Sequence, residues 1–131
     1  MADLTAVMNL FAKYAYANDV RDMAIMESCF TEDATFALQI AGGPELGPFE
    51  GREAVLGFIR PSLEAQTDLR RHVMSNYRVP GGEKADAYLS LIVTDNGVTE
   101  LKSAGLYECE VAEDGGDLRF RRMNLALDNG F

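Results

Sequence analysis

Three glycine-containing turns divide the second half of the chain and strongly limit what it can fold into. They are Pro80-Gly81-Gly82, Asp95-Asn96-Gly97 and the run from Glu113 to Asp117. Glycine and asparagine accept the positive φ angles of tight hairpin turns, so each run predicts a reversal between antiparallel strands. The remaining segments, at residues 68–79, 84–94, 98–112 and 118–127, are therefore predicted to form a four-stranded antiparallel meander.

The first half of the chain has helical periodicity over most of its length. Apolar residues recur at three- and four-residue steps over residues 3–18, 20–29 and 52–66, which predicts three helices. Asp3 is placed to cap the first helix, and Pro61 should kink or end the third. Residues 34–40 alternate weakly, as a strand does. Residues 41–51 form a glycine- and proline-rich loop, for which a short hairpin and a mobile lid are both open.

Helices followed by a run of antiparallel strands are the pattern of the α+β class. The length of 131 residues suits a single domain over residues 1–131. Strands of ten or more residues are long enough to curve. N-terminal helices packed on the concave face of a strongly curved, mostly antiparallel sheet would enclose a cavity, and such a cavity is the expected ligand site.

Charge and composition exclude several classes of function. The net charge of −9 argues against a nucleic-acid partner and against an anionic membrane surface. The chain has no long apolar run and does not begin with a basic and then an apolar segment, so we expect no membrane-spanning helix and no secretory signal. Cys29 and Cys109 lie in apolar contexts, and we expect two reduced core thiols in a cytoplasmic protein.

His72 is the only histidine, and histidine is the side chain whose charge changes near neutral pH. In a strand over residues 68–79, side chains two apart share a face, so one face carries His72, Met74 and Asn76. A base, a flexible apolar group and an amide suit a pocket wall better than a dry core. A histidine on a strand is also commonly a structural residue, and His72 alone leaves both roles open.

The end of the first predicted helix offers a partner for His72. Tyr14 and Asn18 are four residues apart and share a helix face, and Asp19 follows them. If this helix end points into the sheet, the Asp19 carboxylate can orient the imidazole of His72 and raise its basicity. His72 would then act as general acid or base, and Tyr14 would donate to a substrate oxygen. Equally, Asp19 can be a helix cap and Tyr14 a core residue.

The chain lacks the residue patterns that several other kinds of functional site require. One histidine and two distant cysteines give no zinc-site spacing, and the chain has neither a phosphate-binding glycine loop nor a G-x-S-x-G elbow. We therefore expect no metal and no cofactor. Five arginines on two predicted strands are expected on the solvent or interface face of the sheet, with binding of an acidic substrate as the alternative: Arg70, Arg71, Arg119, Arg121 and Arg122.

A set of motifs extends in order over nearly the whole chain: Tyr14-x4-Asp19, Arg21-Asp22, Phe30-Thr31-x-Asp33-Ala34-x-Phe36, Phe49-x-Gly51-x2-Ala54-x3-Phe58, His72-x3-Asn76, Gly105-x-Tyr107 and Arg119-Phe120-Arg121. In order and in spacing, these motifs resemble the SnoaL-like group of the nuclear transport factor 2-like superfamily. This resemblance implies a cone-shaped α+β barrel with a deep apolar pocket. Members of the superfamily include scytalone dehydratase, a bile-acid dehydratase, a dehydrochlorinase, polyketide cyclases, steroid isomerases and small subunits of aromatic-ring dioxygenases.

The resemblance also implies roles for individual residues. Asp19 and His72 match the Asp–His pair of the dehydratase and dehydrochlorinase branch. In that branch the histidine removes a proton next to the leaving group, and the aspartate orients the histidine ring. Tyr14 matches an aromatic pocket residue near that pair. Asn18 stands where scytalone dehydratase has a catalytic tyrosine, and Gly105 where it has an asparagine, so dehydration of scytalone itself is not expected. The late acidic residue of the polyketide cyclases has no clear match, because Glu108 and Glu110 should face outward.

Two hypotheses follow. The first is a cofactor-independent, dehydratase-like lyase or isomerase that acts on a small apolar cyclic, polyketide-like or steroid-like molecule through His72, Asp19 and Tyr14. Its expected pocket wall consists of Asn18, Phe36, Phe58, Met74, Asn76, Tyr88, Gly105 and Tyr107. The second is a non-catalytic ligand-binding or scaffold domain of the same fold, such as a small subunit of a larger oxygenase complex. In either case we expect a homodimer or homotrimer through the outer face of the sheet.

Overall fold

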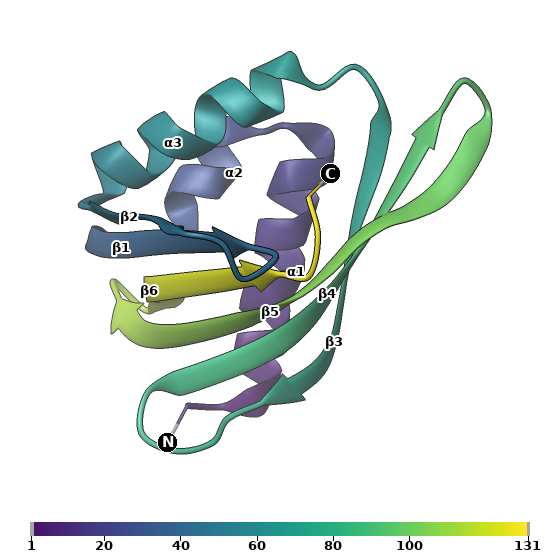
Figure 1. Cartoon of the computed structure of the whole chain (residues 1–131). Coiled ribbons are helices and arrows are strands. Elements are labelled where there is room, and N and C mark those ends of the chain that lie inside the picture. Colours follow the sequence, from purple (N-terminus) through teal and green to yellow (C-terminus); the bar gives the residue numbers. More distant parts are fainter. Residues whose placement is uncertain (1, 131) are drawn as a thin grey trace.

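A computed structural model describes residues 2–130, which form three helices and one six-stranded sheet. The helices are α1 (Leu4–Val20), α2 (Met23–Ser28) and α3 (Arg52–Ala65). The strands are β1 (Phe30–Ile40), β2 (Glu45–Glu50), β3 (Leu69–Arg78), β4 (Lys84–Asp95), β5 (Val98–Asp114) and β6 (Asp117–Leu127). All three helices cover one face of the sheet, which confirms the predicted α+β class (Figure 1).

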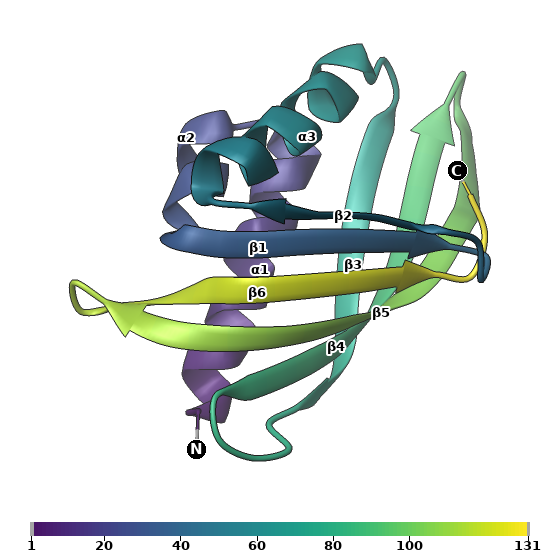
Figure 2. The ribbon, with the colours of Figure 1, turned by 60° about the vertical axis from the view of Figure 1, so that its left-hand side comes forward.

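The strand order is β2-β1-β6-β5-β4-β3, and every neighbouring pair is antiparallel except β1 and β6, which are parallel. Figures 1 and 2 show that β3 and the adjoining parts of β4 and β5 turn away from the plane of β1, β2 and β6. The sheet is therefore strongly curved, as expected, with α1 and α3 on its concave side. Within residues 2–130, no helix is long and apolar enough to cross a membrane.

The hairpin turns form where the sequence predicted them. Asn96 and Gly97 have φ angles of 51° and 75°, and Gly115 and Gly116 have φ angles of 63° and 90°. Positive φ at both central residues matches the right-handed twist of the flanking strands. Each turn consists of only these two residues, so β5 and β6 extend two and one residues further toward their turn than predicted, pairing Asp114 with Asp117.

α1 is positioned by its caps and by one aromatic side chain. The Asp3 carboxylate accepts a hydrogen bond from the backbone N–H of Ala6 at 3.2 Å, as predicted, and Arg21 ends the helix with a φ of 59°. Phe11 is fully buried, and its ring centroid lies 5.0 Å from that of Phe120 and 6.0 Å from that of Tyr107. These contacts fix the helix across the concave face, with its C-terminal end directed toward β3.

Three local predictions differ from the structure to different degrees. The strand predicted over residues 34–40 already begins at Phe30, and its pairing with β6 shifts register before Thr35. Of the two alternatives left open for residues 41–51, the hairpin is the one observed, because residues 45–50 form the edge strand β2. α3 continues four residues beyond Pro61, because burial of its inner face at Val55, Ile59 and Leu63 outweighs the missing backbone hydrogen bond.

A β-bulge at Asn76 interrupts β3. Ser75 pairs with Tyr88 and Arg78 pairs with Asp86, so two residues of β3 lie opposite one residue of β4. Asn76 has a φ of 53°, a left-handed conformation that asparagine adopts more readily than most residues. Beyond the bulge the side-chain alternation reverses, so Asn76 is exposed and Tyr77 packs inward. The predicted face of His72, Met74 and Asn76 therefore ends at Met74.

Substitution of Gly105 by alanine is expected to destabilise the fold by about 1–3 kcal/mol, because overpacked sites strain the backbone. A Cβ at this position would lie 2.6 Å from the backbone oxygen of Ala126 on the adjacent strand. Gly57→Ala in α3 is the matched control, because its Cβ would meet nothing within 4 Å and should stabilise the helix by about 0.5–1 kcal/mol. Urea denaturation of both variants measures the difference, and equal stabilities would contradict it.

Candidate functional site

Asp19 and His72 form a direct contact at the end of α1. The carboxylate oxygen Oδ1 of Asp19 lies 2.7 Å from Nδ1 of the His72 ring. The backbone N–H of His72 also donates to both carboxylate oxygens, at 3.0 and 3.2 Å. The two side chains are 13% and 11% exposed, respectively. The Asp19 carboxylate thus contacts both the backbone N–H and the imidazole ring of His72.

This contact determines which nitrogen of His72 is available for chemistry. An ionised carboxylate can only accept hydrogen bonds, so the Nδ1 atom that faces Asp19 carries a hydrogen. In the neutral ring, Nε2 then holds the lone pair and can take up a proton. The predicted contact between Asp19 and His72 is therefore present, and it orients the ring as general-base chemistry would require.

His72 lines a cavity of about 170 Å³ between α1, α3 and the concave side of the sheet. The wall is mainly apolar, with aromatic rings and aliphatic side chains from both layers. The lining residues are Tyr14, Asn18, Phe36, Leu38, Phe58, Ile59, Ser62, Leu63, Gln66, Arg70, His72, Leu89, Leu91, Tyr107, Leu125 and Leu127. An apolar concavity with a few polar groups around an oriented base is the usual form of a small-molecule site.

Two buried tyrosines on this wall share a hydrogen bond. The hydroxyl oxygens of Tyr14 and Tyr107 are 3.2 Å apart. Burial raises the pKa of Tyr14 to about 12, although the hydrogen bond with Tyr107 partly opposes this shift. Burial, and next the charge of Tyr14, raise the pKa of Tyr107 well above its ordinary value. Both hydroxyls therefore stay protonated near neutral pH and can serve as neutral hydrogen-bond donors.

Tyr14→Phe is expected to remove a phenolate absorbance step near pH 12 from the ultraviolet titration of the protein. The folded-state pKa lies above the ordinary value of 10.0, so the protonated hydroxyl stabilises the fold below pH 10. That stabilisation is lost as pH rises from about 10 to about 12. Tyr16→Phe, at an exposed position on the same helix, is the control. A Tyr14→Phe titration that lost its step near pH 10 would contradict the assignment.

The cavity brings together six of the predicted site residues. Tyr14, Asn18, Phe36, Phe58, His72 and Tyr107 all line it. Asn18 donates from its amide to the backbone oxygen of Tyr14 at 3.0 Å, which fixes the side chain on this wall. Asp19 does not line the cavity, but it contacts the imidazole of His72, which does.

Four predicted pocket residues do not line the cavity. Asn76 lies beyond the bulge on the opposite face, and Tyr88 is 52% exposed, because its neighbours Ala87 and Leu89 point inward. Met74 packs against the core away from the cavity. Gly105 is buried against β6 and contributes close strand packing rather than a side chain. The bulge and the strand alternation are the physical reasons for these corrections.

The sequence-based prediction misplaced Arg70, which was expected on the outer face of the sheet. Its side chain is only 14% exposed and lines the cavity. Strand alternation contained the signal, because Arg70 precedes His72 by two residues and therefore shares its face. The α3 residues Ser62 and Gln66 and the aliphatic wall had no comparable signal, because their position depends on how the helix packs against the sheet.

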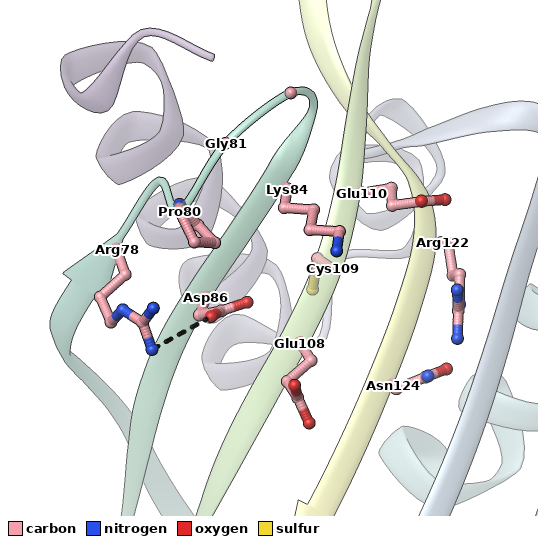
Figure 3. Close-up of a pocket in the computed structure, with 11 residues that line it drawn as sticks. Arg78, Pro80, Gly81, Lys84, Asp86, Glu108, Cys109, Glu110, Arg122 and Asn124 are labelled. Atoms are coloured by element: carbon pink, nitrogen blue, oxygen red, sulfur yellow. Dashed lines mark ion pairs between the residues drawn. The ribbon is translucent and has the colours of Figure 1, made fainter. Parts of the chain in front are cut away.

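A larger hollow, of about 770 Å³, lies on the outer face of the sheet. Figure 3 shows its side chains on the side of the sheet opposite the helices. Three cationic and three anionic residues line it, and Arg78 lies 3.8 Å from Asp86. Because opposite charges face one another and no oriented base is among the lining residues, this hollow is less suited to chemistry than the smaller inner cavity.

Comparisons with known proteins agree with this architecture. A family model described as a SnoaL-like domain matches residues 1–124. Among curated protein sequences, none matches the chain. The chain is similar in structure to Aln2 from a Streptomyces species, with a TM-score of 0.79 and 20% identity over 95% of this chain and 89% of that protein.

Two further solved structures are similar. ActVI-ORFA from Streptomyces coelicolor has a TM-score of 0.79 and 19% identity, over 95% of this chain and 96% of that protein. A protein from Novosphingobium aromaticivorans, provisionally assigned as the beta subunit of an aromatic-ring-hydroxylating dioxygenase, has a TM-score of 0.77 and 17% identity, over 98% and 90%. At these identities the similarities establish the fold alone. Another similar structure, from Nostoc punctiforme, is described as having a cystatin-like fold.

Proposed function

We propose that this chain, which belongs to the family of SnoaL-like domains, is a cofactor-independent lyase or isomerase of the dehydratase type. The observation that carries the proposal is the 2.7 Å contact between Asp19 and His72 on the wall of an apolar cavity. Such a pair is costly to bury without use, because two ionisable groups lose solvation there. An oriented base inside a cavity is also a frequent property of catalytic sites.

His72 is proposed to remove a proton from the carbon next to a substrate carbonyl. The C–H electrons form an enolate, and its oxygen accepts a hydrogen bond from the Tyr14 and Tyr107 pair. When the enolate collapses, a β-hydroxyl leaves and takes the proton from Nε2 of His72, which yields water and a carbon–carbon double bond. Return of the proton to a different carbon would give isomerisation instead. Asp19 keeps the ring in the required tautomer throughout.

The cavity volume limits the substrate. A cavity of roughly 150 Å³ accommodates one benzene molecule, and the cavity here measures about 170 Å³. It therefore suits a single ring, or one ring of a larger molecule that extends past α3. This size favours small cyclic substrates over a fully enclosed steroid-like molecule.

A single-ring β-hydroxyketone such as 3-hydroxycyclohexanone tests the reaction. Incubation in D₂O, followed by nuclear magnetic resonance, would report deuterium at the carbon next to the carbonyl and formation of the unsaturated ketone. We expect both signals with the wild type above the buffer rate. Failure of the wild type to exchange or dehydrate any ketone of a single-ring panel would contradict the proposal.

The second candidate is a ligand-binding or scaffold domain that works through assembly. The observation that favours it is a set of apolar side chains that lie exposed on the sheet face opposite the helices: Leu69, Val73, Tyr88 and Leu101. The likeness to the provisional dioxygenase beta subunit is compatible with such a role. We propose that this face joins copies of the chain into a homodimer or homotrimer. Light scattering coupled to size exclusion would test this, and monomeric wild type at high concentration would contradict it.

A further inference from the structure

Arg70 places a guanidinium on the wall of an otherwise largely apolar cavity. It is the only formally charged side chain among the described lining residues, apart from the titratable His72. Arg70 Nε donates to Oδ1 of Asp68 at 2.9 Å, and Nη2 donates to Oδ2 at 3.3 Å. A two-point contact of this kind fixes the plane of the guanidinium.

Asp68 is itself held in place. The guanidinium of Arg21, at the end of α1, donates to the backbone oxygen of Asp68, and its Nη2 lies 4.0 Å from the carboxylate. The hydrogen bond from Arg70 and the charges of both arginines hold the pKa of Asp68 below its usual value. Arg70 is therefore kept in position by the same helix end that supplies Asp19.

Gln66 supplies a second polar group from the segment that joins α3 to β3. It lines the same cavity as Arg70. Its amide oxygen is buried and has no hydrogen-bond partner within residues 2–130. A buried acceptor without a partner is unfavourable, so a molecule that brings an O–H group to it gains affinity.

We propose that Arg70 and Gln66 form a polar subsite that holds a hydroxyl group on the substrate ring. This inference rests on the proposed function, because it takes the inner cavity as the substrate site. A hydroxyl is the simplest group that accepts from a guanidinium and donates to an amide oxygen through one atom. A carboxylate can accept from Arg70 but cannot donate to Gln66, and it sets its negative oxygens against the Gln66 oxygen. An ether cannot donate at all.

Four single-ring probes of matched size distinguish these possibilities: phenol, anisole, benzoate and toluene. Isothermal titration of the full chain with each probe gives the affinities. We expect phenol to bind about tenfold more tightly than toluene or anisole, since one satisfied buried hydrogen bond accounts for a factor of that order. Benzoate is expected to bind more weakly than phenol. Strongest binding of benzoate would overturn the hydroxyl assignment, and equal binding of all four would overturn the subsite.

Substitutions test whether the preference for phenol depends on Gln66 and Arg70. Gln66→Met and Arg70→Met should each reduce the phenol preference several-fold, whereas Arg71→Met, on the opposite face of β3, should leave it intact. Arg70→Lys tests the site again if Arg70→Met does not fold, because lysine keeps the charge but loses the two-point contact. An unchanged preference in folded Gln66→Met and Arg70→Lys would overturn the inference.

Binding and turnover separate this inference from the proposed function. A phenol preference that depends on Gln66 and Arg70, in a chain that dehydrates no hydroxyketone, would overturn the proposed reaction and uphold the subsite. Turnover of hydroxyketones without any phenol preference would overturn the subsite alone.

Discussion

Replacement of His72 by alanine is expected to lower turnover of a β-hydroxyketone substrate by about 10²–10⁴-fold, with the fold retained. The imidazole is the group proposed to accept the substrate proton, and general acid–base catalysis contributes rate factors of this size. The side chain lies at the cavity wall rather than in the packed core, so its removal leaves the aromatic cluster of α1 intact. Steady-state kinetics of the wild type and the variant, with circular dichroism, measures both effects.

Asp19→Asn tests the orientation of the ring separately. With its amide oxygen in the position of Oδ2, the asparagine can still accept from the backbone N–H of His72. When the amide N–H faces Nδ1, however, the ring favours the tautomer with hydrogen on Nε2, which is the wrong nitrogen for a base. A loss of turnover and a changed pH–rate profile are expected. Arg71→Gln, at an exposed neighbouring position, is the control. Folded His72→Ala and Asp19→Asn proteins with wild-type rates would refute the mechanism.

Phe11→Ala is expected to destabilise the protein by about 3–5 kcal/mol, which is the usual range for a large aromatic residue removed from a core. Phe11 is fully buried, and its ring packs against Tyr77, Tyr107 and Phe120. The vacated space lies beneath the helix that carries Asp19, so loosened packing should also weaken the Asp19–His72 contact. Urea denaturation gives the stability change, and kinetics below the denaturation midpoint gives the functional one.

Met8→Ala is the control for Phe11→Ala. Met8 lies on the same helix but is 42% exposed. Its truncation removes little buried surface, and a change within about 0.5 kcal/mol is expected, as for other surface substitutions. Alanine is the best helix former, so neither variant should lose stability through helix propensity. If both variants were equally destabilised, the loss could not be assigned to the aromatic cluster.

Much of the fold was predictable because its signals are local. The Asn96-Gly97 turn and the capping Asp3 act within a few residues of their own position, so their effect can be read without knowledge of distant contacts. The reversal at Asn76 was not predictable in this way. An asparagine tolerates a left-handed φ but does not require it, and the inward packing of Tyr77 against Phe11 that accompanies the bulge is a contact between residues far apart in the sequence.

The candidate site was also predictable only in part. By itself the sequence determined that one histidine is present and that Tyr14 and Asn18 share a helix face, because the helix period is a local property. Strand alternation also contains the placement of Arg70 on the His72 face, although our prediction put Arg70 on the outer face. The tertiary structure decided that Asp19 meets His72, 53 residues away, at 2.7 Å. It also decided that a cavity of about 170 Å³ remains around the pair. Both outcomes depend on where the curved sheet carries β3 relative to the end of α1, and no spacing along the chain contains that distance.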